Sequence, residues 1–217
     1  MKACFMGLGY IGLPTAIIAA KHGIDIAGVD INPKVVEMTN QGKLHIVEPG
    51  IEEMLKEVVA NGKFRAYTKP QQSDAYFIVV PTPFKNGHQP DVSYVENATR
   101  MIIPLLKKGD LFVIESTSPV GTTDKMSEII FARRPELRGK LHIAYCPERV
   151  LPGNVIYELE HNDRVIGGID EESVEHAKQF YSKFVTGCLH TTNCKTAEMC
   201  KLVENSSRDV QLAFANE

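Results

Sequence analysis

The sequence lacks the features that mark two large classes of protein. No stretch reaches the roughly 18 uncharged apolar residues of a membrane-spanning helix. The 24 basic and 27 acidic residues are mixed along the chain, so no basic cluster points to nucleic acid or to a membrane surface. We therefore expect neither partner, and without a targeting or spanning segment a cytoplasmic location is the default expectation.

Cysteine is also sparse, and its spacing carries no metal-binding pattern. The five cysteines are Cys4, Cys146, Cys188, Cys194 and Cys200. An odd number of cysteines without CxxC spacing argues against both a disulfide framework and a zinc site. We expect all five to be buried, reduced, structural thiols, and we predict no metal site.

Apolar runs typical of strands alternate along the chain with segments typical of helices. The strand-like runs are Lys2 to Met6, Ile24 to Asp30, Ala75 to Val80, Leu111 to Glu115, Leu141 to Tyr145 and Arg164 to Ile169. The first helix-like segment lies between the first of these runs and Lys21. The others are Ile51 to Asn61, Val92 to Lys107 and Thr122 to Arg133. This alternation predicts an α/β fold, with a Rossmann-like doubly wound parallel sheet.

The last segment, 195–217, has no glycine or proline and repeats its apolar residues at helical spacing. It predicts the start of one long helix after a first domain over 1–194. A helix that ends a chain without a C-cap is an unusual way to finish a domain, and we interpret it as truncation. Within the domain, Asp91 is the expected N-cap of the helix that follows it, and Gly109 the expected stop.

A glycine-rich turn follows the first strand. Gly7, Gly9 and Gly12 form GLGYIG, and Asp30 stands 18 positions beyond Gly12, at the end of the second strand. In that context the glycines allow a tight turn, close approach to a pyrophosphate and close helix packing, while the helix N-terminus attracts the phosphates. Asp30 can accept hydrogen bonds from ribose hydroxyls and would repel a 2′-phosphate, which favours NAD over NADP. The alternative is a plain tight turn, with Asp30 capping the next helix.

Five further segments resemble one family. They are VVPTPF at 79–84, ESTSPVGTT at 115–123, AYCPERVLPG at 144–153, NDRVIGG at 162–168 and TAEMCKLVENSSRDVQLAFANE at 196–217. In this order they resemble the UDP-glucose/UDP-N-acetylmannosamine 6-dehydrogenases, and the PERVLPG and AEMCKLxENSxRDV forms resemble the UDP-N-acetyl-D-mannosamine enzymes more than the UDP-glucose enzymes.

The resemblance implies an NAD-dependent oxidoreductase that makes precursors of surface polysaccharides. Its members oxidise the C6 alcohol of a UDP-sugar to an aldehyde and then to a carboxylate, and pass two hydrides in succession to two NAD molecules. The expected substrate is UDP-N-acetyl-D-mannosamine and the product UDP-N-acetyl-D-mannosaminuronate. The alternatives are UDP-N-acetylglucosamine or UDP-glucose as substrate, a different β-hydroxyacid-type dehydrogenase, or a module that binds NAD without turnover.

The family match also suggests roles for individual residues. Thr82 and Thr117 are expected on the nicotinamide side of the cleft, with Thr117 also orienting a catalytic water; each could instead form a local ST-turn or helix cap. Glu148 is expected to position substrate or transfer a proton, unless it is a solvated or Arg149-paired carboxylate. The full cofactor-binding prediction is Gly7, Gly9, Tyr10, Ile11, Gly12, Asp30, Lys34, Pro81, Thr82 and Thr117.

Lys201 and Asn205 share one face of the terminal helix because they are spaced i, i+4. Relatives use a lysine and an asparagine at the matching positions to stabilise oxyanion charge. The alternative is a surface lysine beside an asparagine that packs against another helix. The expected catalytic residues are thus Thr117, Glu148, Lys201 and Asn205.

One element of the family chemistry is missing from the chain. The second oxidation needs a cysteine nucleophile in a glycine-rich GGxC segment. Neither Cys146 nor Cys200 has such surroundings. We therefore expect the nucleophile and a UDP-binding domain to lie downstream of Glu217, the chain alone to be inactive, and the full-length protein to be a homodimer built on the long helix.

Overall fold

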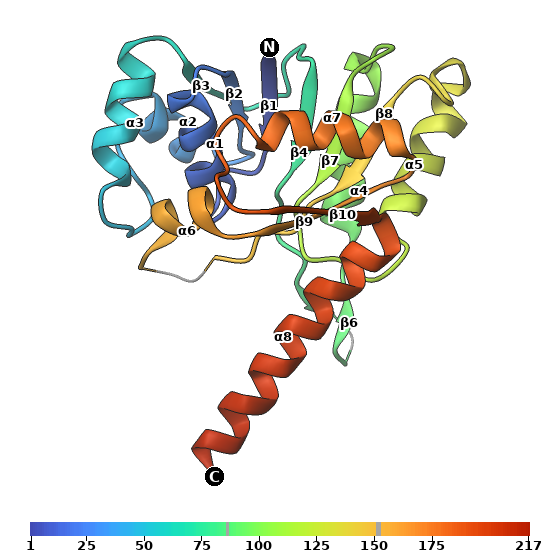
Figure 1. Cartoon of the computed structure of the whole chain (residues 1–217). Coiled ribbons are helices and arrows are strands. Elements are labelled where there is room, and N and C mark those ends of the chain that lie inside the picture. The colour runs from blue at the N-terminus through green and yellow to red at the C-terminus, as the bar shows by residue number, and fades with distance from the viewer. Residues whose placement is uncertain (86, 151–152) are drawn as a thin grey trace.

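The computed structural model describes residues 1–85, 87–150 and 153–217, and its centre is an eight-stranded sheet between two layers of helices (Figure 1). The sheet has the order β10-β9-β8-β7-β4-β1-β2-β3. The central strands are apolar on both faces, as a sheet covered on both sides requires. The strands are β1 (Lys2–Met6), β2 (Asp25–Val29), β3 (Phe64–Tyr67), β4 (Ala75–Ile78), β7 (Leu111–Ile114), β8 (His142–Tyr145), β9 (Arg164–Gly168) and β10 (Leu189–Asn193).

The helices divide between the two faces of the sheet, which makes the fold doubly wound. A short hairpin, β5 (Phe84–Lys85) and β6 (Gln89–Pro90), follows β4. The helices are α1 (Gly12–Lys21), α2 (Pro33–Asn40), α3 (Ile51–Ala60), α4 (Ser93–Ile102), α5 (Thr122–Arg133), α6 (Val155–His161), α7 (Glu171–Tyr181) and α8 (Cys194–Asn216), with 3-10 turns at η1 (Ile103–Leu105) and η2 (Pro135–Leu137).

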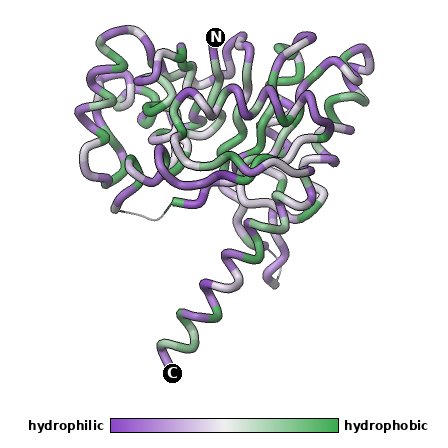
Figure 2. The backbone as a smooth tube through the Cα atoms, in the orientation of Figure 1, coloured by the Kyte–Doolittle hydropathy of each residue, from purple (hydrophilic) through white to green (hydrophobic). Residues whose placement is uncertain are grey.

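Each face of the sheet has its own hydrophobic core. On one face, helices α1, α3, α6 and α7 cover a core in which the rings of Phe5 and Phe77 stack at 4.5 Å between their centroids and Phe180 of α7 packs against Phe77. On the other face, α4 and α5 cover Tyr76 and Phe112. Figure 2 shows the hydrophobic residues concentrated in the strands between the two layers.

The expected fold class is confirmed, but β9 runs against the expected direction, and the edge strand β10, which is parallel to β9, shares that direction. Strand β9 pairs antiparallel with β8, with Tyr145 opposite Gly167. The chain leaves β8 at its carboxyl end, forms α6, and re-enters the sheet at the same end instead of crossing over. Arg164, the first residue of β9, therefore lies near the carboxyl end of β8.

The sequence patterns missed several elements and misplaced some boundaries. The predicted helix over 92–107 ends at Ile102 and continues only as the turn η1, because Pro104 cannot donate the next helical hydrogen bond. Its N-cap residue is Val92, although the Asp91 side chain accepts a hydrogen bond from the Ser93 N–H. Gly109 lies beyond the helix, in a turn with φ of 86°. The elements not predicted are α2, β3, β5, β6, η2, α6, α7 and β10.

Two of the five cysteines contradict the expectation of burial. Cys188 is exposed in the turn that enters the edge strand β10, and Cys200 is only half-buried on α8. Within the described residues, no group of three or more His, Cys, Asp or Glu side chains could hold a metal ion. The same part of the chain contains no helix both long and apolar enough to cross a bilayer.

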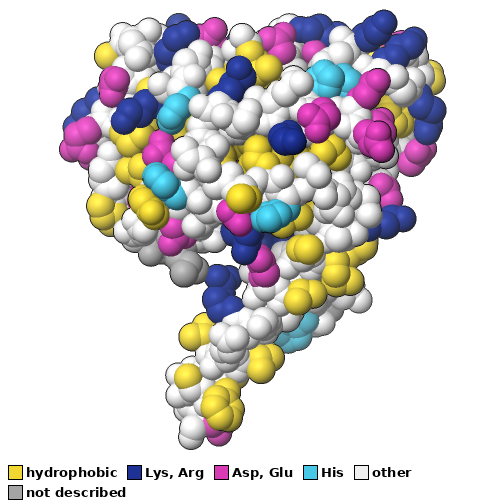
Figure 3. Space-filling model, in the orientation of Figure 1, with side chains coloured by type: hydrophobic (Ala, Val, Ile, Leu, Met, Phe, Trp, Pro, Cys, Tyr) yellow, Lys and Arg dark blue, Asp and Glu magenta, His cyan; other side chains and the backbone are white. Residues whose placement is uncertain are grey.

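The long helix α8 runs away from the sheet as a single 23-residue helix (Figure 1). Figure 3 shows hydrophobic side chains along its protruding part. Val203, Val210, Leu212 and Phe214 are all exposed there. Only the first turns of α8, around Cys194 and Ala197, are buried in the domain.

A buried carboxylate fixes the start of α8. Glu198 is fully buried and accepts hydrogen bonds from the Gly121 N–H at 2.6 Å, the Thr123 N–H at 2.8 Å and the Thr123 hydroxyl at 2.7 Å. These groups form the N-terminus of α5, where unpaired N–H groups and the helix dipole favour an anion. Glu198 therefore caps α5 from α8 and sets the direction in which α8 leaves the domain.

We expect Glu198→Ala to lower the free energy of unfolding by about 2–3 kcal/mol, because it leaves buried N–H groups of α5 without an acceptor. Urea unfolding followed by circular dichroism measures the change. Glu175→Ala removes an exposed carboxylate from α7 and is the control, with an expected change below about 0.5 kcal/mol. Equal effects of the two variants would show that the Glu198 contacts do not stabilise the fold.

Candidate functional site

The three glycines of the turn after β1 meet three different steric demands. Gly7 has φ of 108°, and a Cβ there would lie 2.3 Å from the Val79 carbonyl oxygen. A Cβ on Gly12 would lie 2.1 Å from the Gly7 carbonyl oxygen, so close packing of α1 on the turn requires glycine. A Cβ on Gly9 would meet nothing within 4 Å. Gly9 thus faces open space at the start of α1, where a phosphate can approach the backbone.

Asp30 lies directly after β2 and holds the turn from the side. Its carboxylate accepts hydrogen bonds from the Leu8 N–H at 3.3 Å and the Asn32 N–H at 2.9 Å. The cap of α2 is Asn32, whose side chain accepts from the Lys34 N–H. Asp30 therefore does not serve only as a helix cap, and it lines the cleft beside the glycines.

The ends of β4 and β7 are joined by hydroxyl groups. The Thr82 hydroxyl donates to the Thr117 carbonyl at 2.7 Å, and the Ser116 hydroxyl accepts from the Val80 N–H at 2.9 Å. The first bond links residues 35 positions apart, so Thr82 does not form a local ST-turn. These bonds keep the two turns together at the carboxyl edge of the sheet, where an open α/β sheet binds its ligands.

Glu148 is buried beside a buried arginine. Its Oε2 lies 3.0 Å from Nη1 of Arg164, at angles that do not fit a hydrogen bond, and its Oε1 accepts from the Arg149 N–H at 2.7 Å. The Arg149 side chain instead pairs with Glu204 on α8, with 2.6 Å between Nη2 and Oε1. Glu148 is therefore neither solvated nor paired with the Arg149 side chain. Leu151 and Pro152 of the same segment lie outside the described residues.

Lys201 reaches the site from α8. It is half-buried and lines the same cleft as Thr117 and Glu148. Burial lowers the pKa of Lys201, although the charge of Glu148 acts in the opposite direction. A cation that faces a carboxylate and two strand-end turns can stabilise negative charge that develops on a bound group.

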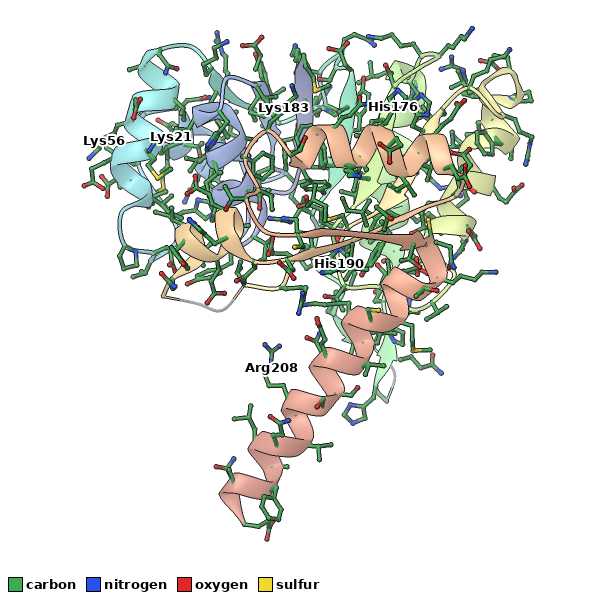
Figure 4. All side chains as sticks on the ribbon, in the orientation of Figure 1. Lys21, Lys56, His176, Lys183, His190 and Arg208 are labelled. Atoms are coloured by element: carbon green, nitrogen blue, oxygen red, sulfur yellow. The ribbon has the colours of Figure 1, made fainter. Side chains whose placement is uncertain are left out.

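Asn205 lies one turn further along α8. It lines a second hollow that shares Thr82 and Thr117 with the first, so the two hollows form one continuous surface. The Asn205 side-chain oxygen accepts a hydrogen bond from Nη2 of Arg208 at 3.1 Å. Figure 4 shows Arg208 projecting from the side of α8.

The structure thus gathers most of the predicted residues in one cleft of about 400 Å³. The predicted residues that line it are Gly7, Gly9, Tyr10, Ile11, Asp30, Pro81, Thr82, Thr117, Glu148 and Lys201. Gly12 is buried beneath the turn, and Lys34 is exposed on α2, away from the lining. The role of Lys34 stays a prediction.

Comparison with known proteins identifies the family. The sequence model of the UDP-glucose/GDP-mannose dehydrogenase family, NAD binding domain, matches residues 1–185. The chain belongs to this family. Residues 1–185 are the NAD-binding domain of this family.

Its relatives include enzymes for different sugars. The chain is 52% identical to the UDP-N-acetyl-D-mannosamine dehydrogenase of Escherichia coli (strain K12), covering 98% of this chain and 52% of that protein. It is 50% identical to the NDP-N-acetyl-D-galactosaminuronic acid dehydrogenase of Ralstonia nicotianae, with the same coverage. It matches the UDP-N-acetyl-mannosamine dehydrogenase structure from Staphylococcus aureus with a TM-score of 0.94 and 42% identity over all of this chain and 53% of that one. The chain therefore spans about half the length of these relatives.

Three charged residues of this NAD-binding domain were missed by the sequence patterns. Glu115 lines the cleft at the end of β7, Arg164 lies buried against Glu148, and Glu48 is buried in the segment before α3. A charged residue at the end of an apolar strand was a possible signal for Glu115 and Arg164. The contacts of Glu48 are with distant segments, and no local pattern indicates them.

Glu48 connects the glycine-rich turn to the segment that follows Glu148. Its carboxylate accepts from the Tyr10 hydroxyl at 2.7 Å, the Gly153 N–H at 3.1 Å and the Val155 N–H at 3.0 Å. Burial alone would raise the pKa of Glu48, but these hydrogen bonds together outweigh it and the pKa is lowered. The ionised carboxylate therefore stabilises the fold at neutral pH, and this contribution is lost as the pH falls through the lowered pKa.

We expect Glu48→Ala to lower the free energy of unfolding by about 2–3 kcal/mol, because it leaves two backbone N–H groups and the Tyr10 hydroxyl without their acceptor. It should also weaken NAD binding, because Tyr10 belongs to the glycine-rich turn. Tyr10→Phe removes only one of the three donors and should cost about 1 kcal/mol or less. Urea unfolding and calorimetry with NAD measure both effects. A Glu48→Ala variant no less stable than Tyr10→Phe would contradict the connecting role.

Proposed function

We propose that this chain is the cofactor half of an NAD-dependent 6-dehydrogenase that converts UDP-N-acetyl-D-mannosamine to UDP-N-acetyl-D-mannosaminuronate, for surface polysaccharide synthesis. The main support is the convergence of Thr117, Glu148 and Lys201 on the cleft that begins at the glycine-rich turn. These residues come from three separate segments, and only the fold brings them together.

The residues present fit an NAD molecule. The open space at Gly9 and the N-terminus of α1 suit the pyrophosphate, and the Asp30 carboxylate suits the adenosine ribose. Thr82 and Thr117 then lie on the nicotinamide side. NAD, when bound, supplies the hydride acceptor, while the chain holds the ring against the strand ends.

Lys201 and Asn205 are proposed to hold the oxygen at the sugar C6 position. Both side chains face the shared surface near Thr117. A half-buried ammonium is well suited to alkoxide charge because few waters compete with it. Glu148, fixed by Arg164, is proposed to position the substrate or to move its proton.

The proposals for substrate and assembly reach beyond this chain, which spans about half the length of its relatives. Relatives at about the same identity carry names for mannosamine and for galactosaminuronic acid derivatives, so UDP-N-acetyl-D-mannosamine is the proposal favoured by the motif forms. A homodimer is proposed for the full-length protein, supported by the exposed apolar residues of α8. The alternative, a module that binds NAD without turnover, differs in making no uronic acid when both halves are present.

The chain should bind NAD more tightly than NADP, because Asp30 would repel a 2′-phosphate. Asp30→Ala should weaken NAD about 10-fold or more, since a hydrogen bond to a charged group contributes about 1.5–3 kcal/mol. Asp25→Ala, at the far end of the same strand, is the control and should leave NAD affinity unchanged. Calorimetry with both cofactors tests this, and equal or tighter NADP binding would overturn the assignment.

In the full-length protein, Lys201→Ala should lower kcat about 100-fold while NAD affinity changes little, because an oxyanion-stabilising charge acts mainly in the transition state. Lys195→Ala removes an exposed lysine side chain from the first turn of α8, and as the matched control it should keep normal kcat. The assay follows NADH absorbance and the mass of the uronic acid product. Near-normal kcat in Lys201→Ala would show that Lys201 is a surface lysine of α8 without a catalytic role.

A further inference from the structure

A buried carboxylate lines the cleft without a full set of partners. Glu115 is only 3% exposed, and its Oε1 accepts a hydrogen bond from the Tyr181 hydroxyl at 2.6 Å. Its Oε2 is buried and has no hydrogen-bond partner among the described residues. An unpaired buried oxygen is costly, so its presence at the cleft needs an explanation. The proposed catalytic roles do not use it.

Glu115 lies on one particular side of the cleft. A dinucleotide crosses this type of sheet with its adenosine on the β2 side and its second nucleoside beyond β1, on the side of β4 and β7. Asp30 marks the first side, and Glu115 is the residue that follows β7 directly. It is separated by one residue from Thr117, so its carboxyl group lies on the nicotinamide side.

The charged groups around Glu115 do not fully neutralise it. Arg164 from β9 attracts it, but the same guanidinium also serves Glu148, at 3.0 Å. Glu148 repels it. Burial is the largest effect and raises the pKa of Glu115 to about 7, against the lowering effects of Arg164 and of Tyr181 from α7. The carboxyl group is therefore close to half-ionised at neutral pH.

The other neighbours keep their charge states over the same range. Burial raises the pKa of Cys146, after β8, to about 12 and that of Tyr181 well above its usual value, so both stay neutral. Lys201 from α8 also lines the cleft, and burial lowers its pKa. A test must separate it from Glu115.

We propose that Glu115 makes this domain distinguish the two redox states of its cofactor, because its carboxylate attracts the positively charged nicotinamide ring of NAD⁺ and not the neutral ring of NADH. The inference rests on the proposed placement of the nicotinamide near Thr117. In a two-step oxidation the reduced cofactor must leave before a second NAD⁺ enters. A buried anion at the ring favours that exchange.

Proton linkage makes the proposal measurable. If NAD⁺ binding favours the ionised form of Glu115, NAD⁺ affinity must rise with pH through about 7, whereas NADH affinity must not. The ratio of the NADH to the NAD⁺ dissociation constant should increase about three- to tenfold between pH 6 and pH 8. Calorimetry or fluorescence titration of the chain with each cofactor gives this ratio.

Three variants assign the effect to Glu115. Glu115→Gln keeps an acceptor for Tyr181 and should make the ratio independent of pH, whereas a contribution from Lys201 would survive in it. Tyr181→Phe removes the hydrogen bond that lowers the pKa of Glu115 and should move the midpoint of the ratio to higher pH. Asp30→Asn should weaken both cofactors equally and leave the ratio unchanged, because the adenosine halves are identical.

The outcomes separate this inference from the proposed function. A wild-type ratio that does not change with pH, or a Glu115→Gln variant that keeps the wild-type pH dependence, would overturn the role of Glu115 alone. Failure of the wild-type chain to bind either cofactor would overturn the placement of NAD in this cleft, and the inference with it. Loss of the pH dependence in Glu115→Gln, with both cofactors still bound, supports it.

Discussion

The floor of the cleft depends on one buried cation that serves two carboxylates. Arg164 lies under the rings of Tyr181 and Phe184, with 5.0 Å and 6.0 Å from its guanidinium carbon to the ring centroids, and its charge is close to both Glu115 and Glu148. One positive charge cannot neutralise two buried anions. Glu148 has the direct contact, and Glu115 is left with a hydroxyl donor and a raised pKa. The unequal sharing gives the two carboxyl groups different chemistry.

The antiparallel direction of β9 makes this arrangement possible. In a fully parallel sheet the first residue of a strand lies at the edge opposite to the ligands. Because β9 enters the sheet beside the carboxyl end of β8, its first residue, Arg164, lies at the ligand edge instead. The reversed strand therefore places the Arg164 charge beneath the cleft, beside Glu148 and Glu115, without a separate loop.

The start of α8 is positioned in a comparable way by a carboxylate. Glu198 occupies the N-terminus of α5, and the ion pair between Arg149 and Glu204 ties the next turn of α8 to the segment that carries Glu148. Lys201 lies between these two attachments along the helix. Its position over the cleft is therefore set by contacts on both sides, before any second domain is considered.

Some of these features follow from the sequence alone, because they are local. The spacing of Gly7, Gly9 and Gly12 and the unbroken helical pattern after residue 195 predict their structures, since sterics and side-chain periodicity act over a few residues. Family motifs also placed Thr117, Glu148 and Lys201 in one site. The strand β3 and the helix α7 gave weaker signals, as short or strongly charged segments do.

Only the tertiary structure decided which charges meet. These contacts join segments 16 to 107 positions apart: Arg164 with Glu148, Glu48 with its three donors, and Glu198 with the N-terminus of α5. Many such pairings are compatible with one sequence, and the fold selects among them by bringing strand ends and helix ends together. The direction of β9 belongs with them, because it depends on where α6 returns the chain and not on the apolar pattern of the strand itself.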